Sequence, residues 1–349
     1  MAERRKLKQG DSIYHCMSRV VDRRFIFGDE EKEWFVRNMR KIEQFTGCEV
    51  LAYCVMSNHF HVLVHVPDAD THYISDAEVL DRIEAMYGKR RRREVEDVLS
   101  RAREQEWSAK AKAAILDQYR NRMNNLSTFM QGLKQRFSHW YNRRKKRKGT
   151  LWEERYKSVI VQGINEPLLT MAAYIELNPI RAGICDDPKE YRWCSFGAAF
   201  GGCKSARAGI LRIFELLGFP EGTWRGVSRR YRRMVVGAGG GRGVAEDSSS
   251  VSGPNVKHIK RGIPQERIDA VLAGDGSLTL EELVRCRVRY FSDGMVIGTK
   301  AFVEEFFDSN RKWFGKRRRS VSRKLPGMQG EGLHSARDLR ISPISAAGD

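Results

Sequence analysis

The sequence predicts an α+β fold, an antiparallel sheet with helices on one face. Strand-like alternation of apolar and polar residues occurs at 12–20, at 49–55 and from Phe60 to Val66. A helical pattern separates the first two of these segments, and Ser57 with Asn58 makes a tight turn between the last two. Strands joined by tight turns favour an antiparallel sheet over a doubly wound parallel one.

The first predicted helix begins at Asp29 and ends at Gly47. Acidic residues fill its first turn, and glycine commonly ends a helix. Its apolar residues recur at helical spacing: Trp34, Phe35, Met39, Ile42 and Phe45.

The strand that follows the turn carries two histidines on one face. His59 and His61 are two residues apart, so both point to the side opposite Phe60. Two neighbouring imidazoles are suited to binding one divalent metal, although a third ligand must come from elsewhere. Taken alone, such a pair is more often made of ordinary surface or core residues.

Residues 69–125 form a charge-rich helical insertion, which includes the run 89–93 of one lysine and four arginines. We interpret it as an inserted helical lobe. A solvated helix pair and a nucleic-acid contact surface both remain open for it. The next helix, 127–144, has an aromatic stripe that includes Tyr141 and leads into six consecutive cations: Arg143, Arg144, Lys145, Lys146, Arg147 and Lys148. Such a cluster can contact phosphates. Residues 150–162 are then predicted to form a further strand.

A helix predicted to start at Asn165 places Tyr174 and Asn178 four residues apart, on one face. Pro179 disfavours helical geometry at Asn178, so the helix should end there. A phenol and an amide at a helix end could both reach a metal-bound phosphate if the helix packs beside the histidine strand. Judged on this segment alone, a core tyrosine and a helix cap are favoured.

The composition points to a polyanionic partner. Lys and Arg number 63 against 44 Asp and Glu, giving a net charge of +19 and a pI near 9.8. No apolar run is long enough to span a membrane, and no signal peptide is recognisable, so we expect a cytoplasmic protein without a membrane partner. The seven cysteines show no Cys-x-x-Cys spacing and suggest neither a disulfide framework nor a structural zinc site.

The remainder of the chain is predicted to form smaller units. We expect a basic helical extension at 203–236, a Gly/Ser linker at 237–254, a small helical unit at 255–319 and a disordered tail at 320–349. The helical unit has a capping-box pattern at Thr279 and Glu282, and Thr299 opens its second helix. It could read DNA as a helix-turn-helix does, or serve equally well in packing or dimerisation.

Four ordered motifs resemble the REP-associated tyrosine transposases, relatives of the insertion-sequence-200-like single-tyrosine HUH transposases. The motifs begin at Met56 (MSNHFHVLV), Gly149 (GTLWEERYKSV), Tyr174 (YIELNPIRAG) and Tyr191 (YRWCSF). The resemblance covers residues 12–201, interrupted by the lobe, and defines 1–202 as the transposase domain. It implies a ferredoxin-like or RRM-like sheet, and a homodimer that acts on single-stranded DNA beside stem-loops (REP-like elements).

The resemblance also implies roles for individual residues. His59, His61 and Asn178 match the metal ligands, and Tyr174 matches the nucleophile that forms a 5′-phosphotyrosine; Tyr141 matches no tyrosine motif. The amide oxygen of Asn178 and the oxygens of a phosphate are hard donors, which fit Mg²⁺ or Mn²⁺ better than Zn²⁺. Candidate phosphate contacts near the motifs are Arg155, Lys157 and Arg181. The alternatives are a relaxase-like or replication-initiator-like nickase, and a domesticated protein that binds structured single-stranded DNA without cutting it.

Overall fold

The computed structural model describes residues 10–68, 73–219, 223–239, 291, 294–325 and 332–336. At its centre is an antiparallel sheet in the order β2-β3-β1-β4. Its strands are β1 (Ser12–Arg19), β2 (Glu49–Val55), β3 (His59–Val66) and β4 (Lys157–Val161). With helix α1 (Asp29–Thr46) after β1 and helices α2 to α5 between β3 and β4, the chain follows the βαββαβ order of ferredoxin-like domains. The predicted α+β class is confirmed.

Helices α1 and α5 (Leu126–Arg144) pack together on one face of the sheet. Phe60 of β3 lies 4.7 Å from Phe35 of α1, and Phe27 stacks at 4.7 Å on Phe137 of α5, measured between ring centroids. Gly47 ends α1 in the left-handed conformation, at φ 70°, as its place in the sequence predicts.

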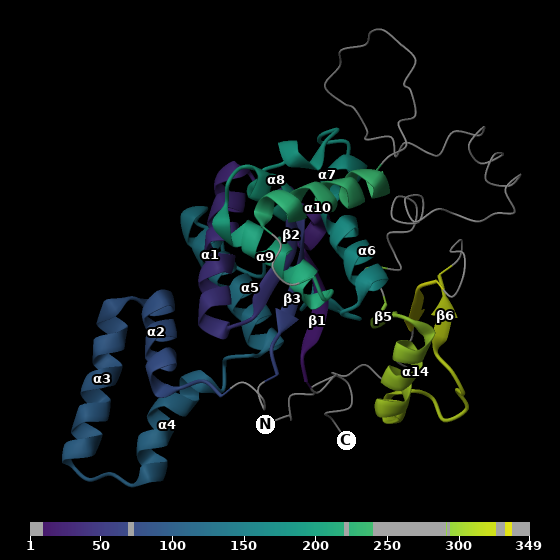
Figure 1. Cartoon of the computed structure of the whole chain (residues 1–349). Coiled ribbons are helices and arrows are strands. Elements are labelled where there is room, and N and C mark those ends of the chain that lie inside the picture. Colours follow the sequence, from purple (N-terminus) through teal and green to yellow (C-terminus); the bar gives the residue numbers. More distant parts are fainter. Residues whose placement is uncertain are drawn as a thin grey trace, which may run out of the picture.

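The structure adds helices on the second face, so β1, β2 and β3 are buried almost throughout. Helix α6 (Asn165–Glu176) packs there, and short α7 (Asn178–Arg181) follows it. Beyond them, α9 (Lys204–Leu216) packs against the edge strand β2, with α8 (Ser195–Phe200) and α10 (Trp224–Gly239) beside it (Figure 1).

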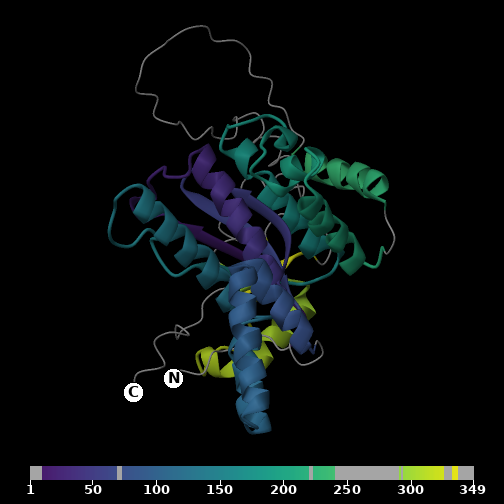
Figure 2. The ribbon, with the colours of Figure 1, turned by 90° about the vertical axis from the view of Figure 1, so that its left-hand side faces the viewer.

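The predicted lobe consists of α2 (Asp76–Tyr87), α3 (Lys89–Glu104) and α4 (Ala109–Arg120), which project from the body (Figures 1 and 2). Its arginines are largely paired within the lobe. Arg92 bonds carboxylates on both α2 and α3, and Arg90 and Arg91 both bond Glu94. This favours a solvated, internally paired helical unit over a nucleic-acid contact surface.

The C-terminal part extends the sheet. β5 (Val296–Gly298) pairs in parallel with β4, and β7 (His334–Ala336) and β6 (Ser322–Lys324) continue it to seven strands, with α14 (Lys300–Ser309) packed on them. Thr299 caps α14, as predicted. The predicted disordered tail from 320 is corrected by β6 and β7, which gain backbone partners from each other and from β5. Most of the predicted linker, and the Thr279 capping box, lie outside the described residues. No helix among those described is long and apolar enough to cross a membrane.

Candidate active site

The two strand histidines lie side by side on the face of the sheet that α6 covers. The ring centroids of His59 and His61 are 5.1 Å apart. His61 is buried and His59 is half-buried. This arrangement follows from the two-residue period of β3, which sends Phe60 into the α1 and α5 layer.

A third histidine, which sequence reasoning missed, completes the group. His15 of β1 stacks on His61 at 5.1 Å, and His15 Nε2 lies 2.9 Å from His61 Nδ1. The register pairs Met17 with His61 and His15 with Leu63, so His15 is a diagonal neighbour on the same face. The alternation of β1 could have indicated its face, but not that β1 would lie beside β3.

The hydrogen bonds determine which nitrogen atoms of these rings carry protons. The backbone oxygen of Phe291 can only accept, so His15 Nδ1 donates to it at 2.9 Å. His15 Nε2 then accepts the proton of His61 Nδ1, and the lone pair of His61 remains on Nε2. His59 Nδ1 donates to Asn58 Oδ1 at 2.7 Å, which likewise leaves its Nε2 as the acceptor. Both rings therefore present the atom that binds a metal.

Burial keeps these imidazoles neutral. It lowers the pKa of His15 to about 4, and burial together with the nearby Arg19 and Arg181 lowers the pKa of His59 to about 4. Burial and then His15 lower the pKa of His61 well below its usual value. Neutral rings at neutral pH are the form that a metal requires.

Helix α6 places Tyr174 against the histidines. The Tyr174 ring meets His61 and His15 edge to face, at centroid distances of 5.7 and 5.8 Å. On its other sides, Phe291 stacks at 4.8 Å and the Arg181 guanidinium lies 4.1 Å from the ring centroid. Tyr174 is fully buried, so a DNA strand can reach it only after these neighbours move.

Asn178 lies one turn further on. Helix α6 ends at Glu176, near the predicted end, but Asn178 is the first residue of α7, so the expectation that Pro179 keeps Asn178 out of helical geometry is wrong. Its amide nitrogen donates to the backbone oxygens of Tyr174 and Ile175, at 3.1 Å each. The amide oxygen of Asn178 is thus the side-chain atom that remains to coordinate a metal. No hydrogen bond joins Asn178 to either strand histidine in the part of the chain that the structure describes.

Residues 8–123 match the family model described as "Transposase IS200 like". This match spans about a third of the chain, and over these residues the chain is similar to the IS200-like transposases. Among solved structures, one similar chain is a REP-associated tyrosine transposase bound to a REP hairpin, with 12% identity and a TM-score of 0.37, covering 58% of this chain and 87% of that one. A search of curated proteins finds no match. The matched residues include His15, His59 and His61, whereas Tyr174 and Asn178 lie beyond them.

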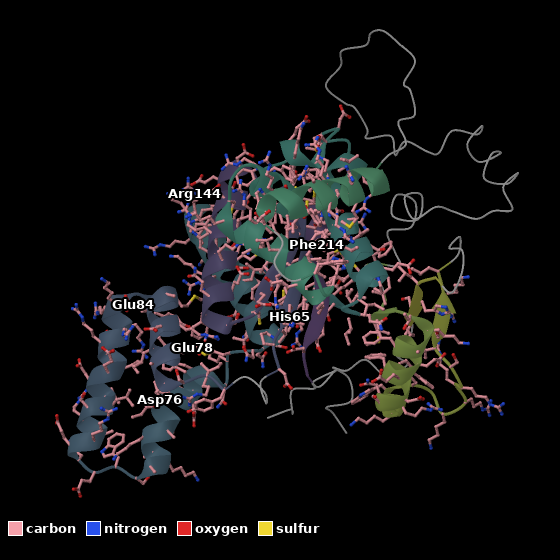
Figure 3. The ribbon with its side chains drawn as sticks, in the orientation of Figure 1. His65, Asp76, Glu78, Glu84, Arg144 and Phe214 are labelled. Atoms are coloured by element: carbon pink, nitrogen blue, oxygen red, sulfur yellow. The ribbon has the colours of Figure 1, made fainter. Side chains whose placement is uncertain are left out.

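The basic run at the end of α5 is partly paired within the protein. Arg144 bonds Glu30 at 2.6 Å and Lys145 bonds Glu31 at 3.2 Å, both at the start of α1 (Figure 3 labels Arg144). Arg147 bonds the backbone oxygen of Thr150 at 2.8 Å. The other cations of the run are exposed: Arg143, Lys146 and Lys148.

The cations near the tyrosine motif differ in their placement. Arg181 adjoins the proposed nucleophile and donates to the backbone oxygen of Tyr174 at 3.0 Å. Arg155 is exposed and lies over Tyr156, and Lys157 forms an ion pair with Glu154 at 3.8 Å. Only Arg181 of these three is in contact with Tyr174 among the described interactions.

A buried carboxyl group holds α6 in position. Glu176 accepts hydrogen bonds from Ser195 Oγ at 2.5 Å, from the Phe196 amide at 3.0 Å and from Tyr231 Oη at 3.1 Å. Burial raises its pKa to about 7. These bonds join α6 to α8 and α10, and so fix the helix that carries Tyr174. Sequence reasoning missed Glu176, since nothing local marks it as buried.

Proposed function

We propose that this protein cuts and rejoins single-stranded DNA through a covalent bond to Tyr174. The observation that supports this most is the contact of the Tyr174 ring with His61 and His15, on a helix that lies beyond the matched family region. A phenol beside the neutral imidazole of His61, whose Nε2 keeps its lone pair, is an arrangement suited to phosphoryl transfer.

In the proposed reaction, the Tyr174 oxygen forms a bond to the scissile phosphorus and the bond from phosphorus to the 3′-oxygen breaks. The tyrosine loses its proton, and the leaving strand gains one as a 3′-hydroxyl. The product is a 5′-phosphotyrosine, which keeps a phosphodiester bond, so another 3′-hydroxyl can reverse the step. Arg181 is placed to neutralise negative charge beside the tyrosine.

The residues present fit a hard divalent ion. His59 and His61 would hold it through Nε2 and Asn178 through its amide oxygen, and a bound Mg²⁺ or Mn²⁺ would polarise the scissile phosphate. Among the described residues there is no group of three or more His, Cys, Asp and Glu side chains that could hold a metal. An amide oxygen and the phosphate of DNA would therefore have to supply the remaining oxygen ligands.

The proposed substrate is single-stranded DNA next to a stem-loop, bound by a homodimer in the cytoplasm. The phosphate contacts would come from the exposed cations Arg143, Lys146 and Lys148, and from Arg155, Lys157 and Arg181. The paired cations Arg144, Lys145 and Arg147 would contribute less, because each must first give up a bond within the protein.

The test is incubation of the purified protein with labelled single-stranded DNA from the flanks of its own gene, with Mn²⁺ or with EDTA, followed by a denaturing gel. We expect a covalent adduct with Mn²⁺ only, and none with Tyr174→Phe, which should still bind DNA. Tyr141→Phe is the matched control and should form the adduct. An adduct of normal yield with Tyr174→Phe would contradict the assignment.

A second candidate is a protein that binds structured single-stranded DNA without cutting it. The complete burial of Tyr174 under Phe291 favours it. A shift in native gels, with no adduct on any flanking sequence, would support this candidate over the first.

A further inference from the structure

Helix α10 carries an array of arginines on its outer side. Arg225, Arg229 and Arg233 recur every four residues, about 6 Å apart along the helix axis, and Arg230 adjoins them. All four are exposed. A surface hollow of about 430 Å³ is lined by Gly226, Arg229, Arg230 and Arg233. This region lies outside the matched family residues.

The charge of these arginines is less neutralised than that of the lobe or of the run after α5. Arg90, Arg91 and Arg92 in the lobe are paired with carboxylates, and the run after α5 is partly paired. Within the described ranges, none of the four outer arginines of α10 forms an ion pair. Exposed charge without an ion pair among the described residues is thus present along one side of α10, where an anionic partner would add a counter-charge.

The opposite side of α10 is buried against the protein. Val227, Tyr231 and Val235 are 6%, 0% and 0% exposed, and Tyr231 bonds Glu176 of α6. Among the described side chains of α10, these apolar ones face the protein and not a lipid surface, which argues against membrane binding. Arg230 stacks at 4.0 Å on Phe219, which holds its guanidinium on the outer side; Phe214, labelled in Figure 3, lies 5.8 Å from it.

We propose that the outer face of α10 is a nucleic-acid-binding surface that contacts the sugar–phosphate backbone without reading bases. An arginine at every turn can contact successive phosphates. The surface is joined through Tyr231 and Glu176 to the helix that carries Tyr174, so it would hold DNA on the layer that contains the active site. This inference rests on the proposed function insofar as the partner is DNA.

The test is the affinity of the full chain for a labelled single strand and for a labelled hairpin, measured by fluorescence anisotropy over a range of salt. In Arg229→Gln/Arg230→Gln/Arg233→Gln we expect Kd to rise about tenfold or more at 100 mM salt. The slope of log K against log salt should fall by about 2 to 3. Arg229→Lys/Arg230→Lys/Arg233→Lys should keep most of the affinity, which excludes a folding defect.

The matched control removes three exposed lobe cations and so changes the net charge equally: Arg93→Gln/Arg103→Gln/Lys110→Gln. We expect its slope to change by less than about 1. Equal losses in both variants would show a general charge effect and overturn the inference, as would an unchanged α10 variant. If the wild type binds and forms its adduct while the α10 variant is unchanged, only this inference fails. If the wild type binds neither probe, both proposals fail.

Discussion

At the scale of single residues, the site depends on a chain of hydrogen bonds as much as on the proposed ligands. His15 accepts a hydrogen bond from His61 Nδ1 through its Nε2 and donates one from its Nδ1 to the backbone oxygen of Phe291. It thereby fixes the ring of His61 with Nε2 directed to the proposed metal site, without being a proposed ligand itself. A partner of this kind raises the basicity of a ligand and orients it.

Replacing His15 by alanine should therefore weaken Mn²⁺ binding by roughly 10- to 100-fold, because His61 loses both its acceptor and its orientation. Mn²⁺ affinity can be measured by electron paramagnetic resonance or calorimetry. His65→Ala is the control on the same face of β3, since His65 bonds Glu49 instead, at 2.6 Å. Equal losses in the two variants would show that the effect of His15 is general destabilisation.

The burial of Lys134, on α5, has a consequence for stability that can be measured. Lys134 is buried beside Trp152 and donates to the backbone oxygen of Glu154 at 2.7 Å. Burial lowers its pKa to about 8, against about 10.4 for an unfolded lysine. Between these values the unfolded chain binds more protons, so the contribution of Lys134 to the free energy of unfolding must rise with pH.

The wild type should gain about 2 kcal/mol of unfolding free energy relative to Lys134→Met between pH 7.5 and 10. The difference between the two proteins cancels the titration of every other group. Urea unfolding followed by tryptophan fluorescence would measure it. A difference that stays constant, or that shrinks as pH rises, would contradict the lowered pKa.

At the scale of elements, α6 is held between two contacts of opposite kinds. Glu176 joins it to α8 and α10 through three hydrogen bonds, while the ring of Phe291 stacks on that of Tyr174. The hydrogen-bonded side is the stronger one, because opening it would leave a buried carboxyl group unsatisfied. Access to Tyr174 should therefore open on the Phe291 side.

Phe291→Ala should accordingly speed formation of the DNA adduct. Aromatic pairs contribute about 0.5–1.5 kcal/mol beyond the area that they bury, and easing the opening by that amount gives a roughly two- to twelvefold rise in rate. The single-turnover rate at saturating DNA measures it. Phe302→Ala in α14, which removes a half-buried ring away from Tyr174, is the control. A slower reaction in Phe291→Ala would mean that the ring positions the tyrosine for attack.

At the scale of the whole molecule, the sequence predicts what is local and misses what depends on distant packing. The histidine pair, the Gly47 helix end and the approximate end of α6 follow from spacing and from backbone preferences. His15 and Glu176 were missed because each owes its role to a partner 46 or 19 residues away. For the same reason no pattern indicated that β5, β6 and β7 would extend the sheet.

The net charge is a second case in which the sequence alone does not reveal what depends on the packing of distant segments. The sequence predicts a polyanionic partner from +19 but cannot tell which cations are available to it. The structure pairs lobe arginines with lobe carboxylates and leaves Arg225, Arg229, Arg230 and Arg233 of α10 exposed. The runs that stand out most in the sequence are thus partly neutralised in the fold.

The central claim is that Tyr174 becomes bonded to DNA, and the most direct test is to locate the bond. The wild-type protein would be incubated with a single-stranded oligonucleotide and Mn²⁺, digested with nuclease and protease, and its peptides analysed by mass spectrometry. We predict a nucleotide remnant on the peptide that contains Tyr174. A remnant on the peptide that contains Tyr141, or on any other residue, would contradict the account.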